Sequence, residues 1–311
     1  MNIYLKWICK LAMFFLLFAI LDHTFGFVIY RIENKAAMLN PEADKIRYLL
    51  KDVTDEVLIV GASDVKFSYR PDILMDSLGL TVYNCGVDKQ RMQYQTALLN
   101  SIMDRYSPKL IIWSVSPEHL ASQDNDMEVL SAFKPYYREN KYFKRLLDNR
   151  SWGEKYKMIS WLYTYNSVFT PDMVLSAVKK SNNDYHRGYN VIPNSKKAPK
   201  RKKKEWKDSP DEYYITLFEE TLKKLHENKL QVIFVFSPRF NYGDYSNIKS
   251  YIIMRQMIEK YGYVLLEDFI YEPTLMHDYL FKDNAHLNNR GVEIYSKMFA
   301  KKIKSLGLGT L

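Results

Sequence analysis

The chain has 311 residues, of which 47% are hydrophobic, 26% charged and 15% aromatic. These values exclude a disordered chain and allow one core of roughly 250 residues plus an anchor, or two small domains. The formal net charge of +9 invites a nucleic-acid interpretation, but residues 196–207 alone contribute +7. The remainder is nearly balanced, so we interpret that segment as a solvated basic loop, with contact to an anionic polymer or lipid headgroup as the alternative.

The N-terminal segment predicts a membrane anchor. Residues 7–21 are apolar except for Lys10, and a second apolar stretch covers residues 25–30. Together they approach the ~20 residues that a membrane helix needs. The residues that follow Leu21 are bulky, whereas a signal-peptide cleavage site needs small ones. We therefore expect residues 1–32 to form an uncleaved signal anchor.

Charge around this segment favours one orientation. Lys6 and Lys10 precede the apolar core and favour a cytoplasmic N-terminus, although Arg31 and Lys35 on the far side weaken the bias. With this orientation the chain beyond about residue 32 faces the periplasm or the cell exterior.

Short apolar runs separated by helical patterns follow the anchor. The runs predict five strands, at residues 56–60, 80–83, 110–115, 230–236 and 263–266. The helical patterns cover residues 93–106, 211–228, 249–261 and 291–303. Near-continuous apolar strands that alternate with helices are typical of a parallel sheet covered on both faces, so the predicted class is a doubly wound α/β fold.

A long insertion separates the third and fourth predicted strands. Residues 118–209 are rich in aromatic and basic residues and predict two or more helices that cover the core, followed by the basic loop. Aromatic residues at this spacing are more typical of a core than of a ligand platform. No internal repeat or linker to a second domain is evident, so we expect residues 33–311 to form one α/β domain with this insertion.

Two segments carry residue types suited to acyl chemistry. Ser63 follows the first strand at a turn, where a nucleophile can lie close to backbone N–H groups, although a capping serine is the commoner explanation for such a position. Asp283 and His286 lie three residues apart before the last helix, a spacing that allows the carboxylate to orient the imidazole as a general base.

The remaining chemistry-bearing residues predict no further site. We interpret the other histidines as satisfied surface or core residues: His23, His119, His186, His226 and His277. The two cysteines, Cys9 and Cys85, have no metal-ligand spacing, and no phosphate loop or dinucleotide fingerprint is present. The sequence therefore predicts neither a metal nor a cofactor.

The segments Gly61-Ala62-Ser63, Asn84-Cys85-Gly86 and Asp283-x-x-His286-Leu287-Asn288-x-x-Gly291 resemble, in order and separation, the conserved blocks of SGNH hydrolases. The resemblance implies a flavodoxin-like sheet of the SGNH type over residues 57–303. It also implies Ser63 as nucleophile, His286 as base and Asp283 as orienting acid. The N–H groups of Ser63 and Gly86 would be oxyanion donors, with Asn84 or Ser116 as substitutes.

The anchor, the insertion with Tyr165-Asn166-Ser167 and the segment His186-Arg187-Gly188-Tyr189 most resemble bacterial membrane-anchored members of this family. That group is similar to the D-alanyl-lipoteichoic acid and alginate O-acetylation proteins. The resemblance implies a serine esterase or O-acyltransferase acting on cell-envelope or exported polysaccharide, with a possible membrane partner that delivers acyl groups.

Two departures from the family's blocks leave an alternative open. Ala62 stands where a polar residue is usual, and Ser114-Val115-Ser116-Pro117 replaces the block that supplies an oxyanion-hole Asn. A missing donor costs about 10²–10³ in rate. The alternative is therefore a catalytically inactive protein of the same fold that binds or assembles polysaccharide. A nucleic-acid partner is disfavoured by the exported location and the local nature of the charge.

Overall fold

The computed structural model describes residues 3–35, 41–122, 129–166, 187–194, 208–240 and 243–307. The chain divides into two compact units, one made of Met1–Arg47 and Asn125–Asn183 and the other of Tyr48–Asp124 and Asp184–Leu311. The predicted basic loop at residues 196–207 lies outside the described residues. The predicted domain limits at residue 32 stay a prediction.

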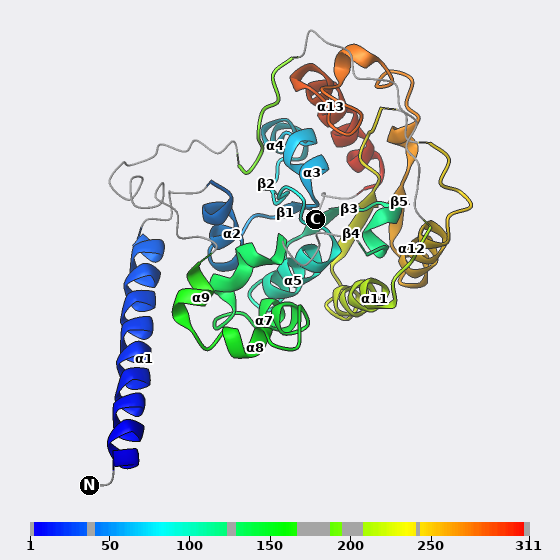
Figure 1. Ribbon diagram of the computed structural model, residues 1–311. Helices are drawn as coiled ribbons and strands as arrows, with labels where there is room; N and C mark the ends of the chain where they lie inside the picture. Colours follow the sequence, from blue (N-terminus) through cyan, green and yellow to red (C-terminus); the bar gives the residue numbers. More distant parts are fainter. Residues whose placement is uncertain are drawn as a thin grey trace. The chain divides into compact units, whose positions relative to one another are not determined.

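The second unit contains a parallel sheet of five strands in the order β2-β1-β3-β4-β5 (Figure 1). The strands are β1 (Val57–Val60), β2 (Val82–Asn84), β3 (Leu110–Ser114), β4 (Gln231–Val235) and β5 (Val264–Leu266). All five predicted strands are confirmed. The order is that of flavodoxin-like doubly wound sheets, in which ligands bind beyond the carboxyl ends of the strands.

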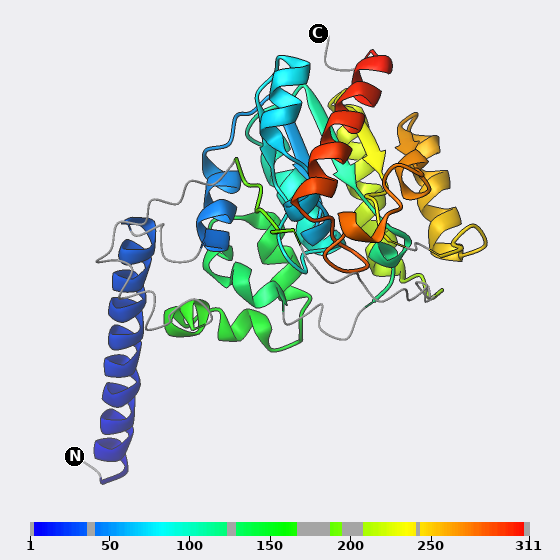
Figure 2. The same ribbon diagram turned by 90° about the horizontal axis from the view of Figure 1, so that it is seen from above.

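Helices cover both faces of this sheet. On one face α13 packs against α3 and α4, and Figure 2 shows α13, in red, running beside α4. On the other face α11 packs against α5 and α12. The helices of this unit are α3 (Ser63–Ser68), α4 (Pro71–Leu78), α5 (Met92–Met103), α11 (Glu212–Glu227), α12 (Lys249–Lys260) and α13 (Asn289–Ser305), with 3₁₀ turns η1 (Pro117–Leu120), η3 (Asp268–Ile270) and η4 (Asp278–Leu280). A further helix, α2 (Pro41–Lys51), contains the boundary between the two units.

The strands are apolar throughout because both of their faces are covered. Every residue of β1 and β3 is buried, and the core continues into Val292, Tyr295 and Phe299 on the inner face of α13. This explains why the strands read as continuous apolar runs while α13 shows a helical period of apolar residues.

The first unit consists of helices only, among its described residues. They are α1 (Ile3–Lys35), η2 (Leu130–Tyr136), α7 (Lys141–Asp148), α8 (Glu154–Lys157) and α9 (Trp161–Tyr165). The insertion therefore contains helices, as predicted. Over Ile3–Arg31, α1 is long and apolar enough to cross a membrane.

The C-terminal half of α1 packs against α9 through one helical face. Asp22, Gly26 and Ile29, spaced four and three residues apart, are buried on that face. The Asp22 carboxylate accepts hydrogen bonds from Ser160 Oγ at 2.6 Å and from the backbone N–H groups of Trp161 and Leu162 at 2.8 and 3.0 Å. A Cβ atom on Gly26 would lie 2.1 Å from Trp161 Cβ, so only glycine permits this approach.

Candidate active site

Ser63 begins α3, two residues after Gly61, which follows β1 at the carboxyl edge of the sheet. The turn is compact because Gly61 lies against Val65 and Ser114, and an added Cβ would come within 2.3 Å of Val65 Cγ2. The backbone N–H of Ser63 belongs to the first turn of α3, whose amides have no partner inside the helix. The strand end thus presents both the hydroxyl and the N–H of Ser63.

Asp283 and His286 lie in the loop between η4 and α13. Two ties hold this loop: a bridge between Phe281 and Leu287, and a hydrogen bond of 2.9 Å from Lys282 N–H to the His286 carbonyl oxygen. Asp283 Oδ1 accepts from the N–H groups of Ala285 and His286 at 2.8 and 3.0 Å. The carboxylate therefore organises the turn that carries the imidazole.

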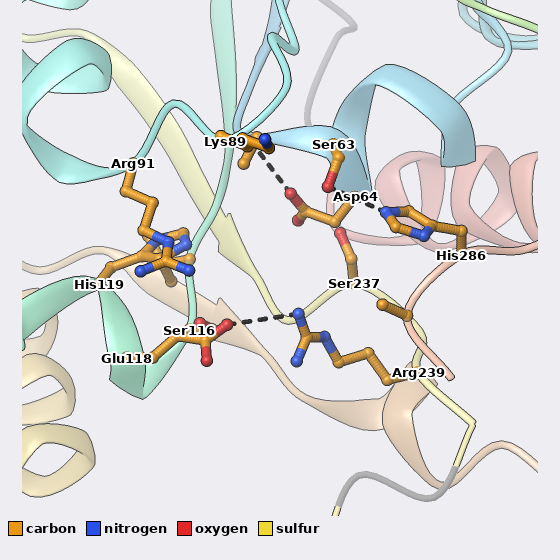
Figure 3. Close-up of a pocket in the computed structure, with 13 residues that line it drawn as sticks. Ser63, Asp64, Lys89, Arg91, Ser116, Glu118, His119, Ser237, Arg239 and His286 are labelled. Atoms are coloured by element: carbon orange, nitrogen blue, oxygen red, sulfur yellow. Dashed lines mark hydrogen bonds and ion pairs between the residues drawn. The ribbon is translucent and has the colours of Figure 1, made fainter. Parts of the chain in front are cut away.

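The structure brings Ser63, His286 and Asp283 together from opposite ends of the chain, and Figure 3 shows the His286 ring beside the Ser63 hydroxyl. His286 Nε2 lies 2.9 Å from Ser63 Oγ, and His286 Nδ1 lies 3.0 Å from each oxygen of Asp283. The ring of Phe67 packs edge-on against the imidazole, with centroids 5.5 Å apart. With its Nδ1 proton held by Asp283, the imidazole has Nε2 free to accept the serine proton.

Asp283 is ionised at neutral pH. Partial burial raises the pKa of this carboxyl, but hydrogen bonds from the His286 ring and from the N–H groups of Ala285 and His286 outweigh burial, so its pKa lies below the usual value. An ionised Asp283 stabilises the positive charge that His286 acquires when it accepts a proton.

The expected oxyanion donors Asn84 and Gly86 lie elsewhere and do not line the pocket beside Ser63. Asn84 is fully buried, and its amide donates to the carbonyl oxygens of Val65 and Tyr69 at 2.8 and 3.0 Å. The Gly86 N–H donates to Asn84 Oδ1 at 3.0 Å. An added Cβ on Gly86 would lie 2.2 Å from Lys66 N. The Asn-x-Gly segment therefore ties the end of β2 to the helix that carries Ser63.

A chain of buried hydroxyl groups ends on Asp64, which sequence analysis passed over. Ser114 Oγ donates to Asp64 Oδ2 and lies 2.7 Å from Ser237 Oγ, which lies 2.9 Å from the Tyr69 hydroxyl. Tyr295 donates to Tyr69 at 2.8 Å. Because each proton is used once, all of these groups donate in the direction of Asp64.

Burial raises the pKa of Tyr69 and of Tyr295, so both phenols keep their protons and remain donors. The other Asp64 oxygen accepts from the Ala62 N–H at 3.0 Å. The hydroxyl chain thus fixes the residue that follows Ser63. A signal was present in the sequence, since Ser114 and Ser237 both stand at the ends of predicted strands.

A pocket of about 140 Å³ opens beside Ser63 and His286 (Figure 3). Its lining combines residues from the ends of β1, β3 and β4, from the segment after β2 and from the loop before α13: Ala62, Ser63, Asp64, Lys89, Arg91, Val115, Ser116, Glu118, His119, Ser237, Arg239, Ala285 and His286. Ser116, considered above as a substitute oxyanion donor, is thus in the pocket.

The interpretation of His119 as a residue with satisfied hydrogen bonds does not agree with the structure. It is 5% exposed, lines the pocket, and its Nδ1 has no hydrogen-bond partner among the described residues. A lone histidine after a strand carries no periodic or spacing signal, so the sequence could not distinguish it from the other four. Of those four, His186 lies outside the described residues, as does Ser167 of the predicted Tyr-Asn-Ser segment.

No group of three or more His, Cys, Asp or Glu side chains within the described ranges is placed to hold a metal ion. No known protein-family model matches this chain, and no curated protein matches it.

Proposed function

We propose that the protein is a serine esterase or O-acyltransferase of the SGNH hydrolase type that acts on acyl esters of cell-envelope or exported polysaccharide. The observation that carries the proposal is the 2.9 Å contact between Ser63 Oγ and His286 Nε2, with Asp283 on the other ring nitrogen. A serine, a base and an orienting carboxylate in hydrogen-bond reach of one another are the parts that nucleophilic acyl transfer requires.

In the first half of the reaction Ser63 Oγ attacks the ester carbonyl carbon while His286 Nε2 takes the serine proton. The carbonyl oxygen becomes an oxyanion, which the Ser63 N–H is placed to stabilise at the start of α3. The intermediate collapses, the C–O bond to the alcohol breaks, and His286 returns the proton to the leaving oxygen. An acyl-Ser63 ester remains.

In the second half His286 removes a proton from water or from a sugar hydroxyl, and the resulting oxygen attacks the acyl-Ser63 carbonyl. Ser63 leaves with the proton from His286. Water yields a carboxylic acid and completes an esterase cycle, whereas a sugar hydroxyl yields a new ester and completes a transferase cycle. The pocket opening is the route by which either acceptor reaches the acyl group.

An inactive polysaccharide-binding or assembly protein is the second candidate, and one observation favours it. Two expected oxyanion donors, the Asn84 amide and the Gly86 N–H, are occupied by hydrogen bonds inside the protein. Ser116 Oγ, buried in the pocket lining without a partner among the described residues, is the remaining side-chain candidate for this role.

Labelling with a fluorophosphonate probe separates the two candidates. Detergent-extracted full-length protein should be labelled covalently, Ser63→Ala should not, and wild type should hydrolyse 4-nitrophenyl acetate. In cells, replacement of the native gene by Ser63→Ala should change the acylation of envelope polysaccharide. Wild-type protein that takes up no probe and hydrolyses no ester favours the binding candidate.

We also propose that α1 is retained as a membrane anchor with the catalytic unit in the periplasm or outside the cell. Residues 3–21 of α1 extend about 28 Å at 1.5 Å per residue, close to the ~30 Å hydrocarbon thickness. Asp22 then marks the membrane boundary, and the residues of α1 that contact α9 lie beyond it. Intact-mass measurement of membrane-extracted protein tests this, and a mature N-terminus beyond residue 20 would contradict it.

A further inference from the structure

The wall of the pocket away from the triad is rich in positive charge. Figure 3 shows Arg91, His119 and Glu118 across the pocket from Ser63 and His286, and Arg239 below Ser237 and His286. Lys89 and Arg91 come from the segment between β2 and α5, and Arg239 from the segment after β4. Three cationic side chains from two separate segments therefore line one pocket. A run of charged residues on an exposed surface would not form such a concave site.

Carboxylates in the lining leave part of this charge unmatched. Arg239 Nη2 pairs with Glu118 Oε1 at 3.3 Å. The Asp64 carboxylate is occupied by Ser114 and Ala62. Within the described part of the chain, Lys89 and Arg91 have no ion-pair partner, and the three cationic side chains of the lining exceed its two carboxylates by one positive charge.

Three polar atoms of the same wall are buried without a partner among the described residues. They are Arg91 Nη1, Ser116 Oγ and His119 Nδ1. Ser116 is 8% exposed and His119 is 5% exposed. Buried polar groups are nearly always hydrogen-bonded, so unpaired ones in a pocket lining indicate a ligand that completes them. Burial lowers the pKa of His119 to about 4, so its ring is neutral at neutral pH and offers both a donor and an acceptor.

The backbone at Lys89 adds an independent indication. Its φ is +60°, a left-handed conformation that lysine rarely adopts. Strained backbone of this kind persists where the surrounding structure holds it, and it concentrates at ligand clamps and active sites. The strained residue here, Lys89, is one of those that line the pocket.

We propose that this wall, defined by Lys89, Arg91, Ser116 and His119, binds an anionic group, a carboxylate or a phosphate, of the substrate whose ester Ser63 attacks. The inference rests on the proposed function and specifies its substrate class. A cationic substrate would be repelled, and a neutral polyol would leave Lys89 and Arg91 without an ion-pair partner. The substrate is therefore an acidic glycan or another acyl ester that bears a negative group near the ester.

The volume of the pocket limits what enters it. Engineered cavities of about 150 Å³ hold one benzene-sized molecule, and this pocket has about 140 Å³. It takes the acyl group and the neighbouring anionic group, while the rest of a polymer stays outside.

Binding is tested separately from catalysis on full-length Ser63→Ala protein in detergent, by calorimetry with three probes. Inorganic phosphate and D-glucuronate carry the two anionic groups, and D-glucose is the neutral control. At least one anion should bind at least about tenfold more tightly than glucose, and the tighter of the two identifies the group. A charge-assisted hydrogen bond supports an effect of this size.

Two variants in the same background locate the site. Arg91→Gln and Lys89→Asn should each weaken anion binding by about tenfold or more, and Asn tolerates the left-handed backbone at position 89. Arg255→Gln is the matched control, because Arg255 lies on α12, is half-exposed, and does not line the pocket. Circular dichroism establishes that each variant is folded, and Lys89→Asn tests the site if Arg91→Gln does not fold.

Equal affinity for glucose and both anions overturns the inference, as does an equal loss in Arg255→Gln. Failure of the proposed function has a different signature. Anion binding that depends on Arg91 in a protein that hydrolyses no ester would leave the binding site standing and remove the catalysis. Ester hydrolysis without anion binding would keep the proposed catalysis and remove the anion site.

Discussion

The junction of α1 with α9 and the pocket beside Ser63 both bury polar side chains, but the two regions differ in how far their hydrogen bonds are satisfied. At the junction the buried carboxylate of Asp22 accepts hydrogen bonds from Ser160, Trp161 and Leu162. In the pocket Arg91, Ser116 and His119 keep polar atoms without a partner among the described residues. A saturated cluster holds segments together, whereas an unsaturated one has capacity left for a ligand.

The cluster of Ser63, His286 and Asp283 is neither fully hydrogen-bonded like the junction nor left without partners like the pocket wall. Asp283 is saturated on one oxygen by the turn that it organises, while the Ser63 hydroxyl and the His286 ring form a contact that a substrate can enter. A fixed carboxylate beside an accessible hydroxyl is what the proposed catalysis requires. The comparison predicts large activity effects and small stability effects at the triad, with the reverse at the junction.

The largest expected effect is on turnover at the triad. Ser63→Ala and His286→Ala should each reduce ester hydrolysis on the order of 10⁶-fold, and the double variant should be scarcely worse, because the residues act as a unit. Melting temperatures should stay near wild type, since both side chains line the pocket rather than the core. Two losses that multiply in the double variant would show that Ser63 and His286 do not work together.

Asp283→Asn should cost less, on the order of 10⁴-fold in kcat, since Asp283 orients His286 and stabilises its charge but does not take the proton.

The Asp283 carboxylate should also make the stability of the protein depend on pH. Because its pKa is lowered by folding, its contribution to stability is present above the unfolded pKa and is lost as pH falls through the folded pKa. Urea titrations between about pH 5 and 2 should show a smaller acid loss in Asp283→Asn than in wild type.

At the junction Asp22→Ala should lower stability by about 1–3 kcal/mol, because the part-buried donors of Ser160, Trp161 and Leu162 would lose their charged acceptor. Asp22→Asn should cost less, since the amide oxygen still accepts. Ester turnover of the surviving folded protein should be unchanged. Limited proteolysis of the detergent-extracted chain measures the effect, with the exposed Asp76→Ala as the control. Equal protease resistance of the Asp22→Ala and Asp76→Ala variants would remove the structural role assigned to Asp22.

A smaller effect is expected from His119 as pH falls. Its folded pKa of about 4 lies below the ordinary value of 6.5, so between these values the unfolded chain binds the additional proton and stability declines on acidification. The slope should reach up to about 1.4 kcal/mol per pH unit. His119→Gln should flatten this window in urea titrations at pH 7, 6 and 5, while the exposed His226→Gln should leave it unchanged. A wild-type protein with constant stability across that range would show that His119 is not buried as described.

The smallest expected effect is at the basic segment of residues 196–207. It lies outside the described residues, and charge runs of this kind are most often solvated. Replacement of residues 200–204 by Ser should change hydrolysis of a small soluble ester by less than about tenfold, a barrier change of ~1.4 kcal/mol. A greater loss would assign the segment to the site.

Several features of the fold followed from local sequence. All five strands were predicted because their residues are apolar on both faces, and the spacing of Asp283 and His286 predicted that both lie on one turn before α13. That Ser63 joins them was an expectation from the family resemblance. The α4 helix and the short α3 were not predicted. Both have fewer than ten residues, too few for a clear helical period.

The assignment of oxyanion donors illustrates what a local pattern leaves out. The order Asn84-x-Gly86 after β2 was visible, but the direction of the Asn84 side chain depends on Val65 and Tyr69, which lie 19 and 15 residues away. Those two carbonyl oxygens compete for the amide that a substrate oxygen would need. Spacing along one strand end carries no information about such a competitor.

By itself the sequence determined the α/β class, the apolar N-terminal helix and the local Asp283–His286 turn, because periodicity and short spacing are properties of neighbouring residues. Only the tertiary structure decided that Asp22 meets Ser160, 138 residues away, and that His286 meets Ser63, 223 residues away. It alone placed Lys89, Arg91 and His119 in one pocket. Such contacts depend on how strands and helices from distant segments pack, and the sequence of any one segment does not contain that packing.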